Sequence, residues 1–367
     1  MPYKSLYVAA TSQHVGKTTS TLGLASSLKS RGINIGYSKP VGQKFVTLDG
    51  IKVDKDVVLF ANLLNFPMIP ALHSPVILGP GTTADFLDFP EKFNFIEDLK
   101  NGSEEIKKLH DLVIFEGTGH PGVGATVNLS NADVAKITES GVIMVAEGGI
   151  GNTIDMLSLC FENFNRLEVP IIGVILNKVL VDKTEKVKHY VAKWLEKKNI
   201  PLLGALPFDK TMGFPLLTTI VESVKGKVEY NKHKLRNLIE GTIAGSLISH
   251  DELTEDANNL LLVVGATRLD LAIDDTITVM KTNNWERPPF SGIIATGYGG
   301  YSPRTIEFIQ HHQIPLIRTM LETHGAVVKI DRIEVKINLD TPWKINRAVE
   351  MINKNVDIDY IVNSLKI

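Results

Sequence analysis

The stretch Ala10–Thr19 reads ATSQHVGKTT and ends in the glycine, lysine and threonine of a phosphate-binding loop. A short apolar run, Ser5–Ala10, precedes it, and Thr18–Arg31 follows with leucines at helical spacing. A strand that leads through a loop into a helix points successive backbone N–H groups at one spot, which binds polyphosphate. The pattern therefore predicts an ATP site in which Lys17 lies over the terminal phosphates and the Thr18 hydroxyl is a ligand of Mg²⁺.

The loop departs from the usual pattern G-x-x-x-x-G-K-[ST] because no glycine opens it. Its phosphate-binding end is complete, because Gly16, Lys17 and Thr18 match the last three positions of the pattern. Gly16 allows the backbone to approach phosphate oxygens closely. The Thr11 hydroxyl can face the same ligand, and Val15 and Thr19 flank these contacts. We expect these loop residues to bind the nucleotide; the alternative is a chance match of three residues at a helix start.

The composition is that of an ordinary globular protein. The 367 residues are 44% hydrophobic and 22% charged, which is enough apolar material for two domains. A formal net charge of −2 creates no global field for nucleic acid or an anionic membrane. We find no signal peptide or membrane-spanning run, so we expect a cytoplasmic protein without nucleic-acid or membrane partners. The single cysteine, Cys160, lies in an apolar run and is expected in the core.

Strand and helix patterns alternate along the first half of the chain, which predicts an α/β fold with a mostly parallel sheet. Nearly continuous apolar runs at Asp111–Gly117, Gly141–Gly149 and Pro170–Lys178 indicate strands that helices cover on both faces. The segment Asp56–Phe66 has a helical pattern, with Asp56 as its expected N-cap.

Glycine and proline interrupt the periodicity just beyond residue 210. The pattern then restarts with a strand at Leu260–Ala266 that runs into a glycine turn, and Pro342–Asn353 is an amphipathic helix. We therefore expect a P-loop domain over residues 1–213. A smaller α/β domain is expected over residues 214–367, including the C-terminal helix.

Carboxylates stand at the ends of the predicted strands. Glu116 ends a buried strand, at the edge where ligands bind in such sheets, and Asp54 and Asp56 follow the second predicted strand, Ile33–Pro40. Mg²⁺ is held by oxygen ligands, so these three residues are candidates to bind it together with Thr18. Taken singly, each acid is more typical of a helix cap or a surface position, and only the nearby phosphate loop favours the metal role.

Lys39 closes the second predicted strand, just before Pro40. The proline imposes an extended or turn conformation that aims Lys39 into the cleft beside the loop. A lysine at a strand end is otherwise a solvated charge. We expect Lys17 and Lys39 to act catalytically, by spreading the charge of a transferred phosphoryl group.

Five stretches of the chain carry a resemblance to a known family: ATSQHVGKTT, SKPVG, FEGTG, GVILNKV and LLGALP. In this order they resemble dethiobiotin-synthetase-like P-loop ATPases, a family that includes the amidating cobyrinic acid synthases. The loop of that family is one residue longer, G-T-D-T-x-V-G-K-T, so Ala10 takes the place of its first glycine. The resemblance implies the phosphate and Mg²⁺ roles given above. It also implies that Asn177 recognises adenine, that the turn Ala205–Pro207 flanks it, and that the protein is a homodimer.

Three further stretches, KPVGQ, VDKDVVLF and FEGTGHPG, resemble the N-terminal domain of some bacterial phosphate acetyltransferases. In those proteins a small domain named for an Asp-Arg-Thr-Gly-Gly (DRTGG) signature follows. Val263–Ile273 and Ile293–Pro303 look like its two halves, although Ala266 stands where aspartate is common. The acetyltransferase domain that would follow is not expected in this chain, which ends at Ile367.

Three positions depart from dethiobiotin synthetases. Gln43 replaces a serine that contacts the diamine substrate, Ser12 replaces the aspartate of the loop, and His120 replaces a glycine. These changes argue against biotin synthesis and leave the ATP-binding positions intact.

Three functions remain open at this point. The first is an ATP-dependent ligase-type enzyme that activates a carboxylate or carbamate of an unknown small molecule. The second is a nucleotide-sensing regulatory protein or partner subunit, related to the non-catalytic part of phosphate acetyltransferase. The third is a degenerate scaffold that binds no nucleotide.

Overall fold

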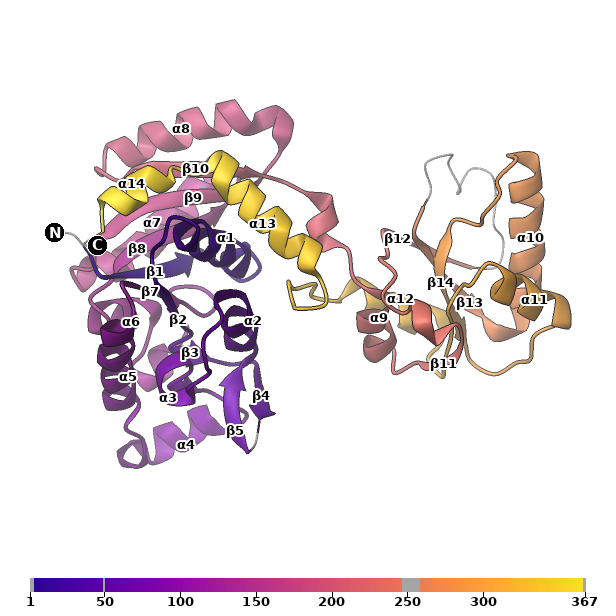
Figure 1. The fold of residues 1–367 in the computed structure, drawn as a ribbon, viewed down its shortest axis with the longest axis horizontal. Coiled ribbons are helices and arrows are strands. Elements are labelled where there is room, and N and C mark those ends of the chain that lie inside the picture. Colours follow the sequence, from indigo (N-terminus) through magenta and orange to yellow (C-terminus); the bar gives the residue numbers. More distant parts are fainter. Residues whose placement is uncertain (1–2, 49, 246–257, 366–367) are drawn as a thin grey trace. The chain divides into compact units, whose positions relative to one another are not determined.

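The chain forms two compact units (Figure 1). The computed structural model describes residues 3–48, 50–245 and 258–365. The first unit contains Met1–Phe208 and Ile337–Ile367, and the second contains Asp209–Lys336. The second unit is therefore an insertion between two parts of the first. The expectation that the C-terminal helix belongs to the second domain is wrong, because the chain beyond Lys336 packs on the first unit.

The first unit is built on a six-stranded sheet in the order β10-β9-β8-β1-β7-β2, and every neighbouring pair is parallel. Its strands are β1 (Ser5–Ala10), β2 (Ile35–Ser38), β7 (Leu112–Glu116), β8 (Gly141–Glu147), β9 (Ile171–Val179) and β10 (Leu202–Pro207). The expected α/β fold with a mostly parallel sheet is confirmed. Because all six strands run the same way, their carboxyl ends meet at one edge.

Helices cover both faces of this sheet. The helices of this unit are α1 (Lys17–Lys29), α2 (Lys55–Leu64), α3 (Pro70–His73), α4 (Thr82–Asp88), α5 (Phe95–Leu109), α6 (Asn131–Ile137), α7 (Gly151–Arg166), α8 (Thr184–Glu196), α13 (Pro342–Asn355) and α14 (Ile358–Asn363). Two short pairs accompany them, β3 (Val41–Gly42) with β6 (Val76–Ile77) and β4 (Phe45–Leu48) with β5 (Ile51–Asp54). Alternate strand residues such as Tyr7, Phe115 and Met144 pack against α5, α6 and α7.

The second unit has a five-stranded sheet in the order β11-β15-β14-β13-β12, in which only β11 is antiparallel to its neighbour. Its strands are β11 (Lys227–Tyr230), β12 (Gly241–Ala244), β13 (Leu260–Gly265), β14 (Phe290–Thr296) and β15 (Leu316–Thr319). Its helices are α9 (Leu217–Ser223), α10 (Leu269–Thr282), α11 (Pro303–His311) and α12 (Thr323–Asp331). Helices α10 and α11 pack on one face, and α9 and α12 on the other.

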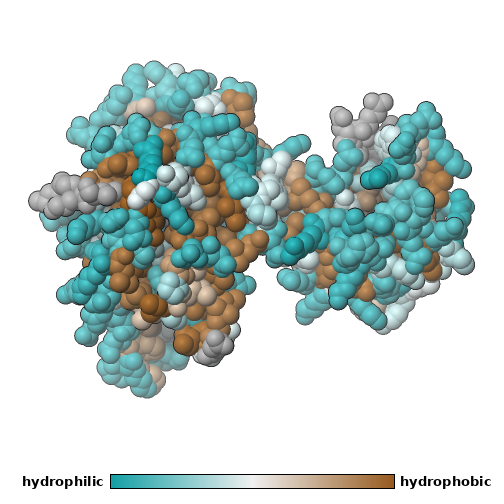
Figure 2. All heavy atoms as spheres, in the orientation of Figure 1, coloured by the Kyte–Doolittle hydropathy of each residue, from teal (hydrophilic) through white to brown (hydrophobic). Residues whose placement is uncertain are grey.

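Hydrophilic residues cover most of the drawn face of each unit (Figure 2). Within the part of the chain that the structure describes, no helix combines the length and apolarity needed to cross a bilayer.

The C-terminal helix α13 packs closely on α1, the helix that begins at the phosphate loop (Figure 1). A Cβ atom on Gly23 of α1 would lie 2.4 Å from Ile352 Cγ1 and 2.8 Å from the carbonyl oxygen of Ala348. Glycine in a helix interior costs stability by itself, so its presence here is explained by the close approach of the two backbones.

We predict that Gly23→Ala lowers the free energy of unfolding by about 1–2 kcal/mol, because overpacking outweighs the gain in helix propensity. Urea denaturation measures this change, and amide hydrogen exchange of α1 locates it. The matched control is Gly151→Ala in α7, where a Cβ would meet nothing within 4 Å. Equal stability of the two variants would show that α13 does not pack on α1 in this way.

Candidate functional site

The phosphate loop connects β1 to α1 at the carboxyl edge of the first sheet. The N–H of Thr11 donates to the carbonyl oxygen of Val145 at 3.0 Å, and Val15 is buried. Gly16 is the N-cap of α1 and has a φ of 97°, a left-handed conformation that favours glycine. Because the first N–H groups of a helix have no intrahelical partner, the first turn from Lys17 presents donors to an anion.

Asn177 at the end of β9 braces this loop from the side. Its Nδ2 donates to the carbonyl oxygen of Val15 at 2.7 Å, and its Oδ1 accepts from the N–H of Lys178 at 2.9 Å. A Cβ on Gly16 would lie 2.0 Å from this Nδ2, so only glycine fits there. Pro207 lies at the same edge, on the neighbouring strand β10, paired with Val179. The structure thus gives Asn177 a role in holding the loop, and adenine recognition by Asn177 and Pro207 stays a proposal.

The side chain of Lys17 reaches the segment that follows β7, where its Nζ donates to the carbonyl oxygen of Gly119 at 2.8 Å. This contact joins the phosphate loop to the FEGTGH stretch, which lies a hundred residues later in the chain.

A buried asparagine that the sequence analysis missed fixes that segment. Asn131 Nδ2 donates to the carbonyl oxygens of Thr118 at 3.0 Å and His120 at 2.9 Å. The Tyr7 hydroxyl donates to Asn131 Oδ1 at 2.9 Å. A Cβ on Gly117 would lie 2.0 Å from this Oδ1, so the glycine of FEGTG leaves room for the asparagine. The glycine spacing of FEGTG was the one signal of a close approach here.

Glu116 at the end of β7 is 0% exposed, and its carboxylate contacts both α1 and β2. Its Oε1 accepts from the Thr18 hydroxyl at 2.9 Å, and its Oε2 accepts from the Tyr37 hydroxyl at 3.3 Å. Burial, and then the charge of Glu116, raises the pKa of Tyr37, so the hydroxyl keeps the proton that it donates.

Lys39 is the cation of this cluster and is 7% exposed. Its Nζ donates to Glu116 Oε1 at 2.9 Å and also pairs with Asp56 Oδ2. Burial alone lowers the pKa of Lys39, but attraction to Glu116, Asp56 and Asp54 together outweighs burial and holds the pKa above its usual value. The ammonium therefore stays charged, and the expected position of Lys39 beside the loop agrees with these contacts.

Asp54 caps helix α2, where its Oδ1 accepts from the N–H of Asp56 at 2.9 Å. The expected N-cap, Asp56, instead lies in the first turn, because the helix begins one residue earlier, at Lys55. The pKa of Asp54 is raised to about 6, chiefly by burial; the charge of Lys39 opposes this rise and the charge of Asp56 adds to it. The carboxylates are thus crowded, and a cation beside them is favoured.

These residues fit Mg²⁺ that is shared with phosphate. Mg²⁺ takes one or two carboxylates and completes its shell with water and phosphate oxygens. The Thr18 hydroxyl, Asp54, Asp56 and Glu116 supply such oxygens at one edge of the sheet. Within residues 3–48, 50–245 and 258–365, no three His, Cys, Asp or Glu side chains group as a metal-binding set.

Other residues singled out in the sequence lie apart from this cluster of charges. Gln13 and His14 are exposed at the middle of the loop, and His120 is exposed as well, with its Nδ1 accepting from the N–H of Gly122 at 3.2 Å. Cys160 is buried, and burial raises its pKa to about 11, so the expectation of a core residue is confirmed.

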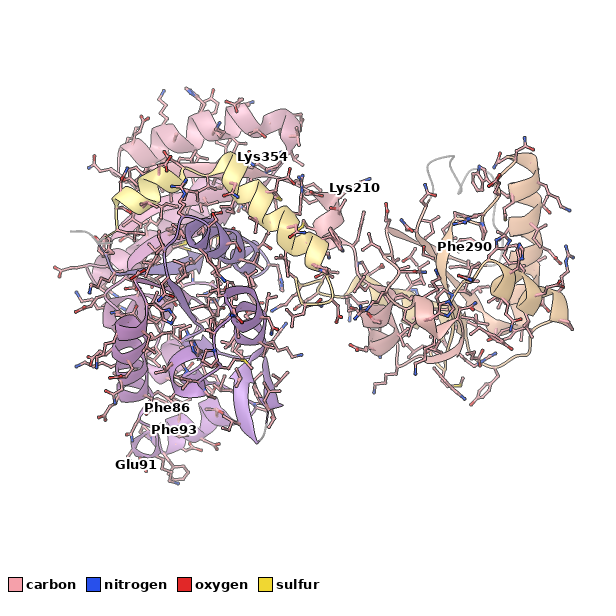
Figure 3. All side chains as sticks on the ribbon, in the orientation of Figure 1. Phe86, Glu91, Phe93, Lys210, Phe290 and Lys354 are labelled. Atoms are coloured by element: carbon pink, nitrogen blue, oxygen red, sulfur yellow. The ribbon has the colours of Figure 1, made fainter. Side chains whose placement is uncertain are left out.

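A separate cavity of about 560 Å³ lies where α4 and α5 meet. Figure 3 labels two of its phenylalanines, Phe86 and Phe93. The rings of Phe93 and Phe95 have centroids 4.9 Å apart. None of the residues that line this cavity belongs to the phosphate loop or to the cluster around Glu116.

A family model described as an AAA domain matches residues 4–215, so the chain belongs to this family. Over 209 residues the chain is 28% identical to ATP-dependent dethiobiotin synthetase BioD of Methanocaldococcus jannaschii, covering 54% of this chain and 92% of that protein. Over 309 residues it is 24% identical to a probable cobyric acid synthase of Methanococcus vannielii. This match covers 72% of this chain and 60% of that protein. The resemblance to dethiobiotin-synthetase-like P-loop proteins is confirmed.

The similarity to phosphate acetyltransferases extends over more of the chain. Over 366 residues the chain is 22% identical to phosphate acetyltransferase of Nitratidesulfovibrio vulgaris, which covers 96% of this chain and 50% of that protein. The chain thus spans about half the length of the phosphate acetyltransferases that it matches.

We predict that Asn131→Ala lowers the free energy of unfolding by about 2–3 kcal/mol, because the buried Tyr7 hydroxyl loses its acceptor and two backbone carbonyl groups lose their donor. The control is Asn62→Ala, which removes one exposed hydrogen bond to Val58 and changes stability by less than about 0.5 kcal/mol. Urea denaturation measures both variants. An Asn131 variant as stable as the Asn62 variant would contradict the role assigned to this side chain.

Proposed function

We propose that this member of the AAA domain family binds ATP with Mg²⁺ and transfers its terminal phosphoryl group to a carboxylate or carbamate, which releases ADP. An amine then attacks the carbonyl carbon of the mixed anhydride, so that a C–N bond forms, the C–O bond to phosphate breaks and inorganic phosphate leaves. The observation that carries the proposal is the convergence of Lys17, Thr18, Lys39 and Glu116 at the carboxyl edge of one parallel sheet. Phosphoryl transfer depends mainly on positioning and on spreading negative charge, and these residues supply both.

Each side chain has a stated part in the proposal. The N–H groups of the first turn of α1 hold the phosphates, and Lys17 and Lys39 bring positive charge to them. The Thr18 hydroxyl and Glu116, with Asp54 or Asp56, would hold Mg²⁺, which when bound neutralises phosphate charge. The names of two groups of relatives, dethiobiotin synthetase and cobyric acid synthase, support an ATP-dependent ligase-type reaction.

The acceptor differs from that of dethiobiotin synthetases in this proposal, because Gln43 replaces the serine that contacts the diamine there. Gln43 is exposed and directly follows β3, four residues after Lys39 in the chain. The proposal also includes a homodimer, which rests on the family resemblance, and a cytoplasmic location, which rests on the sequence pattern.

A second candidate is a nucleotide sensor that binds ATP without consuming it. The observation that favours it is the 96% coverage of this chain by phosphate acetyltransferase, compared with 54% by a dethiobiotin synthetase. In this candidate, nucleotide at the phosphate loop regulates association with an enzyme of the acetyltransferase type. The second unit would then be the part that carries the signal.

We predict that Lys17→Ala weakens ATP binding about 10–100-fold, the loss expected when a charged hydrogen bond of about 1.5–3 kcal/mol is removed. Isothermal titration calorimetry with Mg²⁺ present measures the affinity. Lys29→Ala at the other end of α1 is the control and retains the affinity of the unmodified chain. If Lys17→Ala binds ATP as tightly as the control, the loop is not the phosphate site.

We predict that the unmodified chain forms ADP when Mg²⁺-ATP is supplied together with a panel of amino acids and diamines in bicarbonate buffer. A coupled assay for ADP measures turnover, and Lys39→Ala, which lacks the second cation, is at least about tenfold slower. Tight ATP binding with no ADP formation would contradict the enzyme and favour the sensor. Failure to bind ATP at all would contradict both functions.

A further inference from the structure

The cluster around Glu116 carries more negative than positive charge. Lys39 is surrounded by Glu116, Asp56 and Asp54, and all four side chains are buried. Buried carboxylates without nearby cations are costly, because water no longer screens their repulsion. The Lys39 ammonium is attracted to all three carboxylates and is in direct contact with two of them, Asp56 and Glu116.

The oxygen that Lys39 contacts is also the one nearest to the expected metal ligand Thr18. Glu116 Oε1 receives both the Lys39 ammonium at 2.9 Å and the Thr18 hydroxyl at 2.9 Å. The other oxygen, Oε2, is held by the Tyr37 hydroxyl. Asp56 Oδ2 is paired with the same ammonium. Glu116 and Asp56 thus already have a cation against them, at the place where Mg²⁺ would need their oxygens.

We propose that Lys39 is the internal counter-cation of Asp56 and Glu116 in the nucleotide-free chain, and that its ammonium group competes with Mg²⁺ for these carboxylates. This inference rests on the proposed function, which assigns Mg²⁺ to this edge of the sheet. The Lys39 ammonium then has two successive partners: the carboxylates before the metal binds, and the phosphates afterwards.

The backbone allows such a change without moving the sheet. The N–H of Lys39 donates to the carbonyl oxygen of His73 at 2.8 Å, and Pro40 restricts the chain on the other side. The lysine side chain has four rotatable bonds and a compact ammonium, so it can exchange partners while its backbone stays fixed. Lys39 therefore reaches toward the phosphate loop only when another cation meets the charge of Asp56 and Glu116.

The first test measures binding of Mn²⁺, a spectroscopic substitute for Mg²⁺, to the full chain without nucleotide, by electron paramagnetic resonance. We expect Lys39→Met to bind Mn²⁺ about tenfold more tightly than the unmodified chain, because the competing charge is removed. Lys39→Arg keeps the charge and should stay within about threefold. Lys55→Met is the control for the loss of a positive charge that is screened by solvent. Lys55 lies between Asp54 and Asp56 in the chain but is exposed, so its loss should change the Mn²⁺ affinity less than about threefold.

The inference is overturned if Lys39→Met binds Mn²⁺ no more tightly than the unmodified chain, or if Lys55→Met has the same effect as Lys39→Met. A second measurement uses the unmodified chain, in case Lys39→Met does not fold. Acetylation of Lys39, followed by mass spectrometry, should be slow without metal and several-fold faster with saturating Mg²⁺, while acetylation of exposed Lys55 stays constant. Unchanged protection of Lys39 at saturating Mg²⁺ would also overturn it.

The two proposals fail separately. Calorimetry of Mg²⁺-ATP on the same samples tests the proposed function directly. If ATP binds and the Mn²⁺ affinity does not respond to Lys39→Met, the counter-cation role is wrong and the function stands. If ATP does not bind but Mn²⁺ affinity rises in Lys39→Met, the function is wrong and the competition between cations stands.

Discussion

The central constraint in this structure is the buried carboxylate of Glu116. A buried charge is stable only when it is paired and hydrogen-bonded. Three side chains meet this need, Thr18 from α1, Tyr37 from β2 and Lys39 from the turn after β2. The phosphate loop, the second strand and the end of β7 are thereby fixed relative to one another, and Lys39 extends the network to Asp56.

The parts predicted from sequence are those that local pattern determines. Apolar runs and the Gly16-Lys17-Thr18 end of the loop predict the parallel sheet and the phosphate site, because both depend on neighbours in the chain. The pairing of Tyr7 with Asn131 was missed, since 124 positions separate the two residues and neither belongs to a motif. The assignment of α13 failed because an amphipathic pattern reports a buried face but not its partner. Gly23, a glycine inside a helix, was the one available hint of the contact.

Because the second unit is inserted in the chain of the first, the C-terminal segment Ile337–Ile367 packs on the first unit. The chain that leaves the second unit at Lys336 continues into α13, which packs on α1. Helix α1 begins with the residues that the proposed nucleotide would contact. The helix that begins at the phosphate loop is thus in direct contact with the segment that follows the second unit in the chain, and the sensor candidate needs such a contact.

The most direct test is a crystal structure of the chain with Mg²⁺ and a non-hydrolysable ATP analogue. We expect phosphates against the first turn of α1 and a metal ion in contact with Thr18. We also expect the Lys39 ammonium to have left Glu116 and Asp56 and to lie against phosphate oxygen. A phosphate loop without nucleotide at a saturating concentration of the analogue, or nucleotide bound elsewhere, would contradict these assignments.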